Sequence, residues 1–143
     1  MSIRPVPRFL LVPAMAVALG PMALAQSFEF HQLPVPGPAV TAERVNDAGM
    51  VVGNLLDPTT GTLSGWTADL DEYTTYHHPG AFATTLNDIN NSGTIVGYVF
   101  DAAGNHGLHL PAQGGSELIE YPGFEGGSVV WGVNNNGVMT GSF

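Results

Sequence analysis

The residues of this chain best suited to chemistry are its five histidines and twelve carboxylates. His106 and His109 are three positions apart, which places them on opposite faces of a strand, and no third zinc ligand stands near them. His77 and His78 adjoin a Pro-Gly pair, where an exposed or packed imidazole is expected. This pattern predicts no catalytic histidine and no metal site, and we expect no cofactor.

One acidic segment has the opening pattern of a calcium-binding loop. Residues 88–93 read D-I-N-N-S-G, with side-chain oxygens at alternate positions and a glycine at the sixth. The twelfth position is Val99, where the loop requires a bidentate Glu. Asp88 itself is replaced by Arg44 and Gly132 at the equivalent positions of the related segments described below. We therefore interpret 88–93 as a structural turn.

Composition and motifs exclude several other chemistries. The chain has no Cys, and its three basic residues are all Arg, so disulfides, Cys-ligated metals and Schiff-base lysines are excluded. No G-x-S-x-G elbow and no Gly-rich phosphate loop occurs. The acidic pair Asp69 and Asp71 is more simply a solvated turn than a glycosidase pair. Trp66 and Trp131 are expected in the core, although either could stack on a sugar ring.

The first 25 residues have the pattern of a secretory signal peptide. Arg4 and Arg8 form a positive region, an apolar stretch follows over 9–19, and 23–25 read Ala-Leu-Ala, as at a cleavage site. Prolines and a glycine interrupt the apolar stretch, which makes it too short for a membrane span. We expect a secreted, extracellular or periplasmic protein that begins at Gln26 and does not insert into a membrane after the signal is removed.

The charge balance of the mature chain limits its partners. After removal of 1–25, Arg44 is the single basic residue against all twelve acids. Binding to nucleic acid or to anionic lipid requires several Lys or Arg residues, so both are excluded. We expect an extracellular glycan, a matrix component or a protein as the partner.

An internal repeat of 44 residues runs through the mature chain. The repeated segment reads VNDAGMVVG, INNSGTIVG and VNNNGVMTG at 45–53, 89–97 and 133–141. Pro-Gly pairs recur in the same order, 43 residues apart, at 36–37, 79–80 and 122–123. The two markers keep their order in every unit, so the units are related.

The Asn-x-x-Gly element shared by these units predicts a tight hairpin turn with a bulge. An Asn side chain accepts hydrogen bonds from backbone N–H groups two residues on, and Gly adopts a positive φ without a Cβ clash. The predicted structural turn residues are Asn46, Gly49, Asn90, Gly93, Asn134 and Gly137.

Each unit has the pattern of about four short strands. Residues 94–100 place apolar side chains on both faces, so this strand requires burial on both sides. A strand at 83–89 precedes it, and strands near 107–110 and 117–121 follow. Because the mature chain lacks helical periodicity, the sequence predicts an all-β fold.

Residues 88–98 and 100–108 carry a motif that resembles a known family. They match the pattern g-I-N-n-x-G-x-I-V-G-y, then d-x-x-G-x-x-H-a/g-F, of the bacterial extracellular HAF repeat. The resemblance covers most of 28–143, although Ser64 stands in place of the His and Leu108 in place of the Phe. It implies a secreted tandem-repeat β protein, commonly drawn as propeller-like, with no established activity and no catalytic residues.

The repeat length suggests an architecture and leaves two functions open. A period of 44 fits a four-stranded propeller blade, but propellers close with about 4–8 blades, and 26–143 holds about 2.7 units. We expect an incomplete propeller-like array, from truncation or completed by self-association; an open β-sandwich is the alternative.

The sequence favours a non-enzymatic binding or structural module. The alternative is part of a secreted propeller hydrolase or lyase with its acids on 69–72.

Overall fold

The structure, a computed structural model, describes residues 28–37 and 39–143, which contain ten strands and no helix. The predicted all-β fold is therefore confirmed. The predicted signal peptide, 1–25, lies outside the described residues. Nothing in the described part of the chain is a helix long and apolar enough to cross a membrane. The chain divides into Met1–Phe30, of which 28–30 are described and form no strand, and His31–Phe143, which contains all ten strands.

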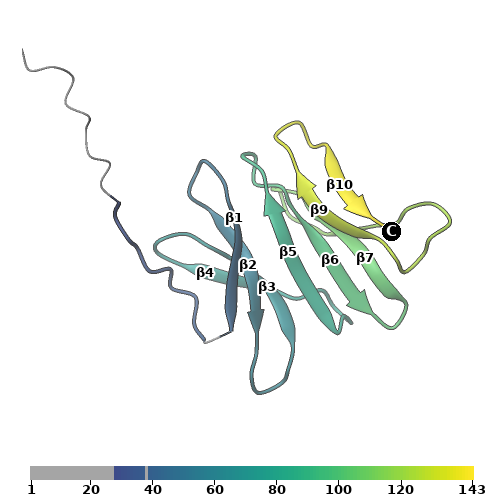
Figure 1. The fold of residues 1–143 in the computed structure, drawn as a ribbon, viewed down its shortest axis with the longest axis horizontal. Helices are drawn as coiled ribbons and strands as arrows, with labels where there is room; N and C mark the ends of the chain where they lie inside the picture. The colour runs from purple at the N-terminus through teal and green to yellow at the C-terminus, as the bar shows by residue number, and fades with distance from the viewer. Residues whose placement is uncertain (1–27, 38) are drawn as a thin grey trace, which may run out of the picture. The chain divides into compact units, whose positions relative to one another are not determined.

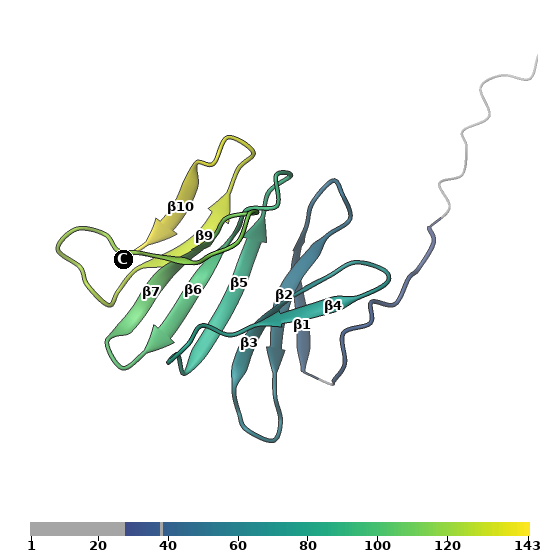
Figure 2. The same ribbon diagram turned by 180° about the vertical axis from the view of Figure 1, so that it is seen from behind.

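The strands fall into three consecutive groups, which we call layers 1, 2 and 3 (Figures 1 and 2). Layer 1 contains β1 (Val40–Val45), β2 (Val51–Leu56), β3 (Leu63–Ala68) and β4 (Tyr73–Tyr76). Layer 2 contains β5 (Ala83–Ile89), β6 (Ile95–Asp101), β7 (Gly104–Leu110) and β8 (Glu117–Ile119). Layer 3 contains β9 (Val129–Val133) and β10 (Met139–Ser142).

Each layer is an antiparallel meander in which consecutive strands pair. One parallel pair, Leu63 with Ala83, joins β3 to β5, so layers 1 and 2 form one mixed sheet by hydrogen bonding. The first strand of a layer packs against the preceding layer: β5 contacts β1 and β2, and β9 contacts β5 and β6. The three layers therefore follow one another in chain order.

The first hairpin of every layer carries a β-bulge at the same place. The strand register skips one residue in β1, in β5 and in β9, and the skipped residues are Glu43, Asn87 and Trp131. These positions are 44 residues apart. The bulge lies in the first strand, three residues before the Asn, and not in the turn where the sequence predicts it. A bulge increases the local twist of a hairpin, so the three hairpins twist alike.

A glycine opposite each bulge allows the two strands to approach closely. A Cβ atom on Gly53 or Gly97 would lie 1.9 Å from the carbonyl oxygen of Thr41 or Thr85, respectively. A Cβ on Gly141 would lie 2.3 Å from the carbonyl oxygen of Val129. No side chain fits at such distances, which explains why each repeated segment ends in Gly.

The core consists of two clusters, one at each contact between layers. The cluster between layers 1 and 2 is built from Val52, Leu86, Ile89, Val99 and Leu108. The cluster between layers 2 and 3 is built from Val96, Val130 and Val133, with Ile119 and Met139 against it. Strand β6 contributes Val99 to the first and Val96 to the second, and both are fully buried. The predicted burial of both faces of this strand is confirmed.

Candidate functional site

Three asparagine turns of one geometry close the first hairpins of the layers. In the first turn, the Asn46 side-chain oxygen accepts hydrogen bonds from the backbone N–H groups of Ala48, at 3.1 Å, and Met50, at 3.0 Å. The Asn90 and Asn134 side chains accept the corresponding pairs of bonds at 2.9–3.1 Å. The glycines of the turns, Gly49, Gly93 and Gly137, have φ of 83°, 84° and 77°. All six predicted turn residues thus lie in these turns.

The amide groups of the same asparagines join one turn to the next. Asn46 Nδ2 donates to the carbonyl oxygen of Asn90 at 3.2 Å, and Asn90 Nδ2 donates to the carbonyl oxygen of Asn134 at 3.1 Å. Each of these bonds spans 44 residues. The side chain therefore forms its own turn with its oxygen and holds the next turn with its nitrogen. We call this chain of bonds the turn ladder.

The residues that follow the asparagines add a second row to the turn ladder. The backbone N–H of Asp47 donates to the Asn91 side-chain oxygen at 3.0 Å. In the same way, the backbone N–H of Asn91 donates to the Asn135 side-chain oxygen at 2.9 Å. Asn91 Nδ2 donates back to the Asp47 carboxylate at 2.6 Å. Asn90, in the middle turn, is buried, whereas Asn46 is half-buried and Asn134 is exposed. Neighbouring turns on both sides are what bury Asn90.

Asp88, the first residue of the calcium-like segment, connects layers 2 and 3. Its Oδ2 accepts a hydrogen bond from the backbone N–H of Val133 at 2.9 Å, and its Oδ1 lies 3.7 Å from Arg44 Nε. Among the described residues, no group of three or more His, Asp or Glu side chains is arranged to hold a metal ion. Asp88 therefore acts here as a contact between strands.

His106 is held between two carboxylates. Its Nδ1 bonds to Glu120 Oε1, and its Nε2 lies 3.0 Å from Asp101 Oδ1. The side chain is 13% exposed. Strand pairing of β7 with β8 brings Glu120 beside His106, and the β6–β7 turn brings Asp101 to its other edge. A cavity of about 530 Å³ adjoins this group.

Both carboxylates favour the charged imidazolium form of His106. The hydrogen bond to Glu120 is the main cause that raises the pKa of His106, and the bond to Asp101 adds to it against the effect of burial. The backbone N–H of Ala103 and the bond to His106 lower the pKa of Asp101. Because both ring nitrogens are occupied, the imidazole has no free lone pair with which to accept a proton from a substrate. This group is a structural connection within layer 2.

The remaining predicted polar residues stabilise turns and strand ends. Asp69 Oδ1 accepts hydrogen bonds from the N–H groups of Asp71 and Glu72, both at 2.9 Å, and these bonds lower the pKa of Asp69. His77 bonds to Ser64 Oγ at 3.2 Å and to a backbone carbonyl. Asp69 is thus an ionised turn residue, as the sequence predicts, and its lowered pKa does not suit a general acid.

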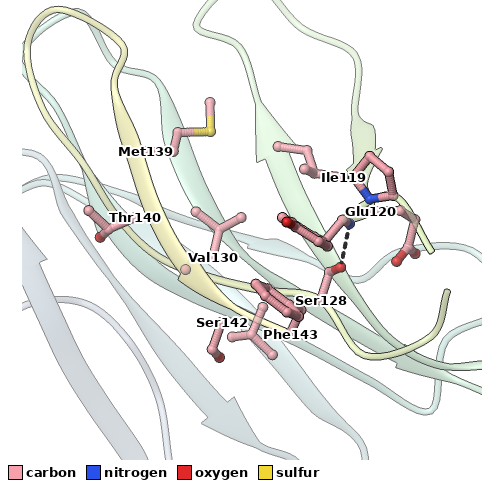
Figure 3. Close-up of a pocket in the computed structure, with 12 residues that line it drawn as sticks. Ile119, Glu120, Ser128, Val130, Met139, Thr140, Ser142 and Phe143 are labelled. Carbon is pink, nitrogen blue, oxygen red and sulfur yellow. Dashed lines mark hydrogen bonds between the residues drawn. The ribbon is translucent and has the colours of Figure 1, made fainter. Parts of the chain in front are cut away.

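A second cavity, of about 290 Å³, lies between the end of β8 and layer 3 (Figure 3). Its lining includes the apolar side chains of Ile119, Val130 and Met139, together with the hydroxyl-bearing residues Ser128, Thr140 and Ser142. The N–H of Tyr121 donates to Ser128 Oγ at 2.8 Å, which fixes the chain after β8 against β9. We call this the layer 3 cavity.

Two aromatic residues, Tyr121 and Phe143, line the layer 3 cavity. Phe143 stacks on Tyr121 with ring centroids 3.9 Å apart and planes 8° apart, and Phe124 packs against both. Trp131 is 53% exposed and donates to Ser142 Oγ at 3.1 Å, whereas Trp66 is 1% exposed. The expected core position is therefore correct for Trp66 and wrong for Trp131, because the bulge in β9 turns the Trp131 side chain out of the core.

The sequence carries only part of the signal for these features. The layer 3 cavity and the Glu120 contact depend on strand pairing between distant residues, which no local motif encodes. The bulge positions could have been predicted from the sequence, since the glycines opposite them recur every 44 residues. Comparisons of the chain with family models, with curated proteins and with solved structures found no match.

Proposed function

We propose that this chain is a secreted or cell-surface repeat protein that serves as a non-enzymatic binding or structural module. The turn ladder carries the proposal, because the same hydrogen bonds connect turns that are 44 residues apart. Units that hold one another in this way form a scaffold whose exposed loops are free to vary. The HAF-like motif and the signal peptide pattern support export, and the spacing supports a propeller-like array of blade-like units.

We propose the layer 3 cavity as the place where a partner binds on this scaffold. Its lining contains apolar side chains, hydroxyl-bearing residues and two exposed aromatic rings, those of Tyr121 and Phe143. Such a surface suits sugar rings or apolar side chains, which pack on aromatic faces while hydroxyl groups bond at the rim. The acidic charge of the mature chain disfavours anionic partners. We therefore assign the cavity to a neutral extracellular glycan, with a matrix component or a protein as the other partner classes.

A binding experiment with two matched phenylalanines tests this assignment. Phe143 lines the cavity, and Phe82 is equally exposed but lies outside it, packed edge-on against Phe100. Affinity electrophoresis of the exported chain in a panel of neutral polysaccharides should show retardation of the original protein and of Phe82→Ala. Phe143→Ala should bind at least tenfold more weakly.

Three outcomes would overturn the proposal in different ways. Equal binding by both variants would place the partner elsewhere on the molecule, and no binding to any polysaccharide would remove the glycan assignment. Release of reducing ends during incubation would make the chain an enzyme. No contact of the acidic segment 69–72 favours that alternative, since Asp69 is engaged in its own turn.

A further inference from the structure

The first strands of the three layers differ in how deeply their equivalent residues are buried. Val45, Ile89 and Val133 are 44 residues apart, at the ends of β1, β5 and β9. Ile89 is 6% exposed and Val133 is 8% exposed, each packed against a residue of the preceding layer, Val52 or Val96. Val45 is 63% exposed. Layer 1 thus presents an uncovered surface of the kind that layers 2 and 3 bury.

The second strands show the opposite pattern. Val52 of β2 and Val96 of β6 are fully buried under the next layer. Thr140 occupies the equivalent position of β10 and is exposed. The face of layer 3 that contains Thr140 therefore corresponds to the faces of layers 1 and 2 that pack against the next layer. This exposed face of layer 3 and the exposed face of layer 1 are equivalent to the two surfaces that meet at each contact within the chain.

The turn ladder has matching open ends. Asn46 and Asn90 each donate an amide N–H to the carbonyl oxygen of the next turn, and Asn134 has no such acceptor in the described part of the chain. At the other end, the Asn46 carbonyl oxygen accepts from Gly49 and, among the described residues, receives no amide from an earlier turn. The exposed Asp47 carboxylate stands where Asn91 and Asn135 present their acceptor oxygens.

We propose that two copies of this chain associate head to tail, with layer 3 of one protomer docked on layer 1 of its partner. Asn134 Nδ2 then donates to the Asn46 carbonyl of the partner subunit, and the Asn135 N–H donates to the Asp47 carboxylate of the partner subunit. The contact buries Val45 of the partner subunit as Ile89 is buried within one chain. This proposal rests on the repeat organisation proposed above, and the residues that test it, Val45, Asp47 and Asn135, do not line the layer 3 cavity.

The contact joins different surfaces, so it leaves one of each kind free on a dimer. Such a heterologous contact continues until the copies close into a ring, or else it produces a filament. Each added copy extends the turn ladder by three turns. The proposed association between chains thus uses the same hydrogen bonds and the same packing that join the layers within one chain.

Engineered cysteines test the contact directly, because the chain has no Cys of its own. Asp47→Cys and Asn135→Cys, each introduced into a separate preparation of the exported chain and then mixed in a glutathione buffer, should form a disulfide-linked heterodimer. Each variant alone should form at least tenfold less covalent dimer, since like ends do not meet. The double variant with Asp47→Cys and Asn91→Cys is the internal control, because these side chains lie 2.6 Å apart within one chain.

A charge placed on the docking surface provides the second measurement. Val45→Glu should raise the dissociation constant at least tenfold in sedimentation velocity, while Leu70→Glu, an equally exposed position on the β3–β4 turn, should leave it unchanged. Covalent dimers that form equally from like and unlike cysteines, or association that is insensitive to Val45→Glu, would overturn the head-to-tail contact. Failure of the internal disulfide would instead contradict the turn ladder and, with it, the proposed repeat organisation.

Discussion

The contact between layers 1 and 2 and the contact between layers 2 and 3 have equivalent turn bonds and bulge positions but different side chains. Leu86 fills the first contact against Gly65, and Val130 occupies the equivalent place against Gly107 in the second. Tyr76 of β4 packs against the first cluster, whereas the smaller Ile119 of β8 packs against the second. The second contact therefore contains less side-chain volume, and the layer 3 cavity lies there. Glycines and asparagines set the spacing of the layers, and side-chain volume decides whether the contact is filled.

Polar contacts join both pairs of layers, through different residues. The Asn54 side chain accepts from the Leu86 N–H at 2.9 Å and donates to the Leu86 carbonyl at 3.4 Å, which ties β2 to β5. The equivalent residue of β6 is Tyr98, whose ring meets Trp131 edge-on at 6.2 Å.

The second contact has polar bonds of its own, from Asn87 Nδ2 to the Val130 carbonyl at 2.8 Å and from the Val133 N–H to Asp88 Oδ2 at 2.9 Å. Because polar bonds join both pairs of layers and the second contact contains less side-chain volume, we expect the second contact to open before the first when the protein is destabilised.

The largest expected effect comes from the glycines opposite the bulges. Gly97→Ala would place a Cβ 1.9 Å from the Thr85 carbonyl oxygen in the middle layer, and we expect it to lower the free energy of unfolding by about 3 kcal/mol. Gly141→Ala makes the same clash in β10, which pairs with β9 alone and can shift, so about 1 kcal/mol is expected. Urea denaturation measures both, and equal losses would show that the two contacts are equally rigid.

Removal of a ladder asparagine should have the next largest effect. Asn90→Ala removes three bonds within its turn and one to the next turn from a buried position, so we expect a loss of about 2–3 kcal/mol. Asn134→Ala removes only the bonds within an exposed turn, and about 1 kcal/mol is expected.

Asn90→Asp separates the two roles of this side chain. It keeps an acceptor for the turn but loses the N–H that Asn134 receives, so its loss in the same denaturation experiment should fall between those of the two alanine variants. A loss as small as that of Asn134→Ala would mean that the turn ladder contributes little to stability.

The sequence predicts the hairpin turns well because their chemistry is local. Asn46 and Gly49 are three residues apart and form one turn, so the motif contains all the partners that the turn requires. The same local rule identifies strand β5 with its observed bounds and both buried faces of β6. These elements depend on neighbours within a few residues.

Features that depend on distant partners could not be predicted in the same way. The second role of Asn90 is its amide bond to a turn 44 residues away. The Asn-x-x-Gly motif does not indicate this bond, because the hydrogen bonds of the side-chain oxygen within the turn are a sufficient reason for an Asn at this position. Glu120 and His106 are 14 residues apart and meet only because β7 and β8 pair. Trp131 is a large apolar residue of the kind expected in a core, and only the register of the bulge turns its side chain outward.

Exchange of side-chain volume between the two contacts tests why only one contains the layer 3 cavity. Val130→Leu should fill part of the cavity and stabilise the protein by up to about 1 kcal/mol, because one buried methylene contributes about 0.8 kcal/mol. Leu86→Val should destabilise it by about 1 kcal/mol, since it removes a methylene from a filled contact. Thermal unfolding of both variants measures the difference. Destabilisation by Val130→Leu would show that the cavity walls cannot accept a larger side chain.

The smallest expected effect concerns a position at which layers 1 and 2 differ in charge. His106 precedes Gly107 in β7, and Ser64 precedes Gly65 at the same place in β3, so His106→Ser makes layer 2 resemble layer 1.

Because the pKa of His106 is raised on folding, its stabilising contribution is complete below about pH 6.5 and is lost as the pH rises through the folded-state value. Because the pKa of Asp101 is lowered, its contribution is present above about pH 3.8 and is lost as the pH falls through its folded-state value. The original protein should therefore exceed His106→Ser in stability by more at about pH 5.5 than at about pH 8.5. Melting temperatures of both proteins at the two pH values give this difference directly, since the two proteins differ at position 106 alone. A difference that grows with pH would mean that the folded protein holds His106 as the neutral imidazole, against the contacts with Glu120 and Asp101.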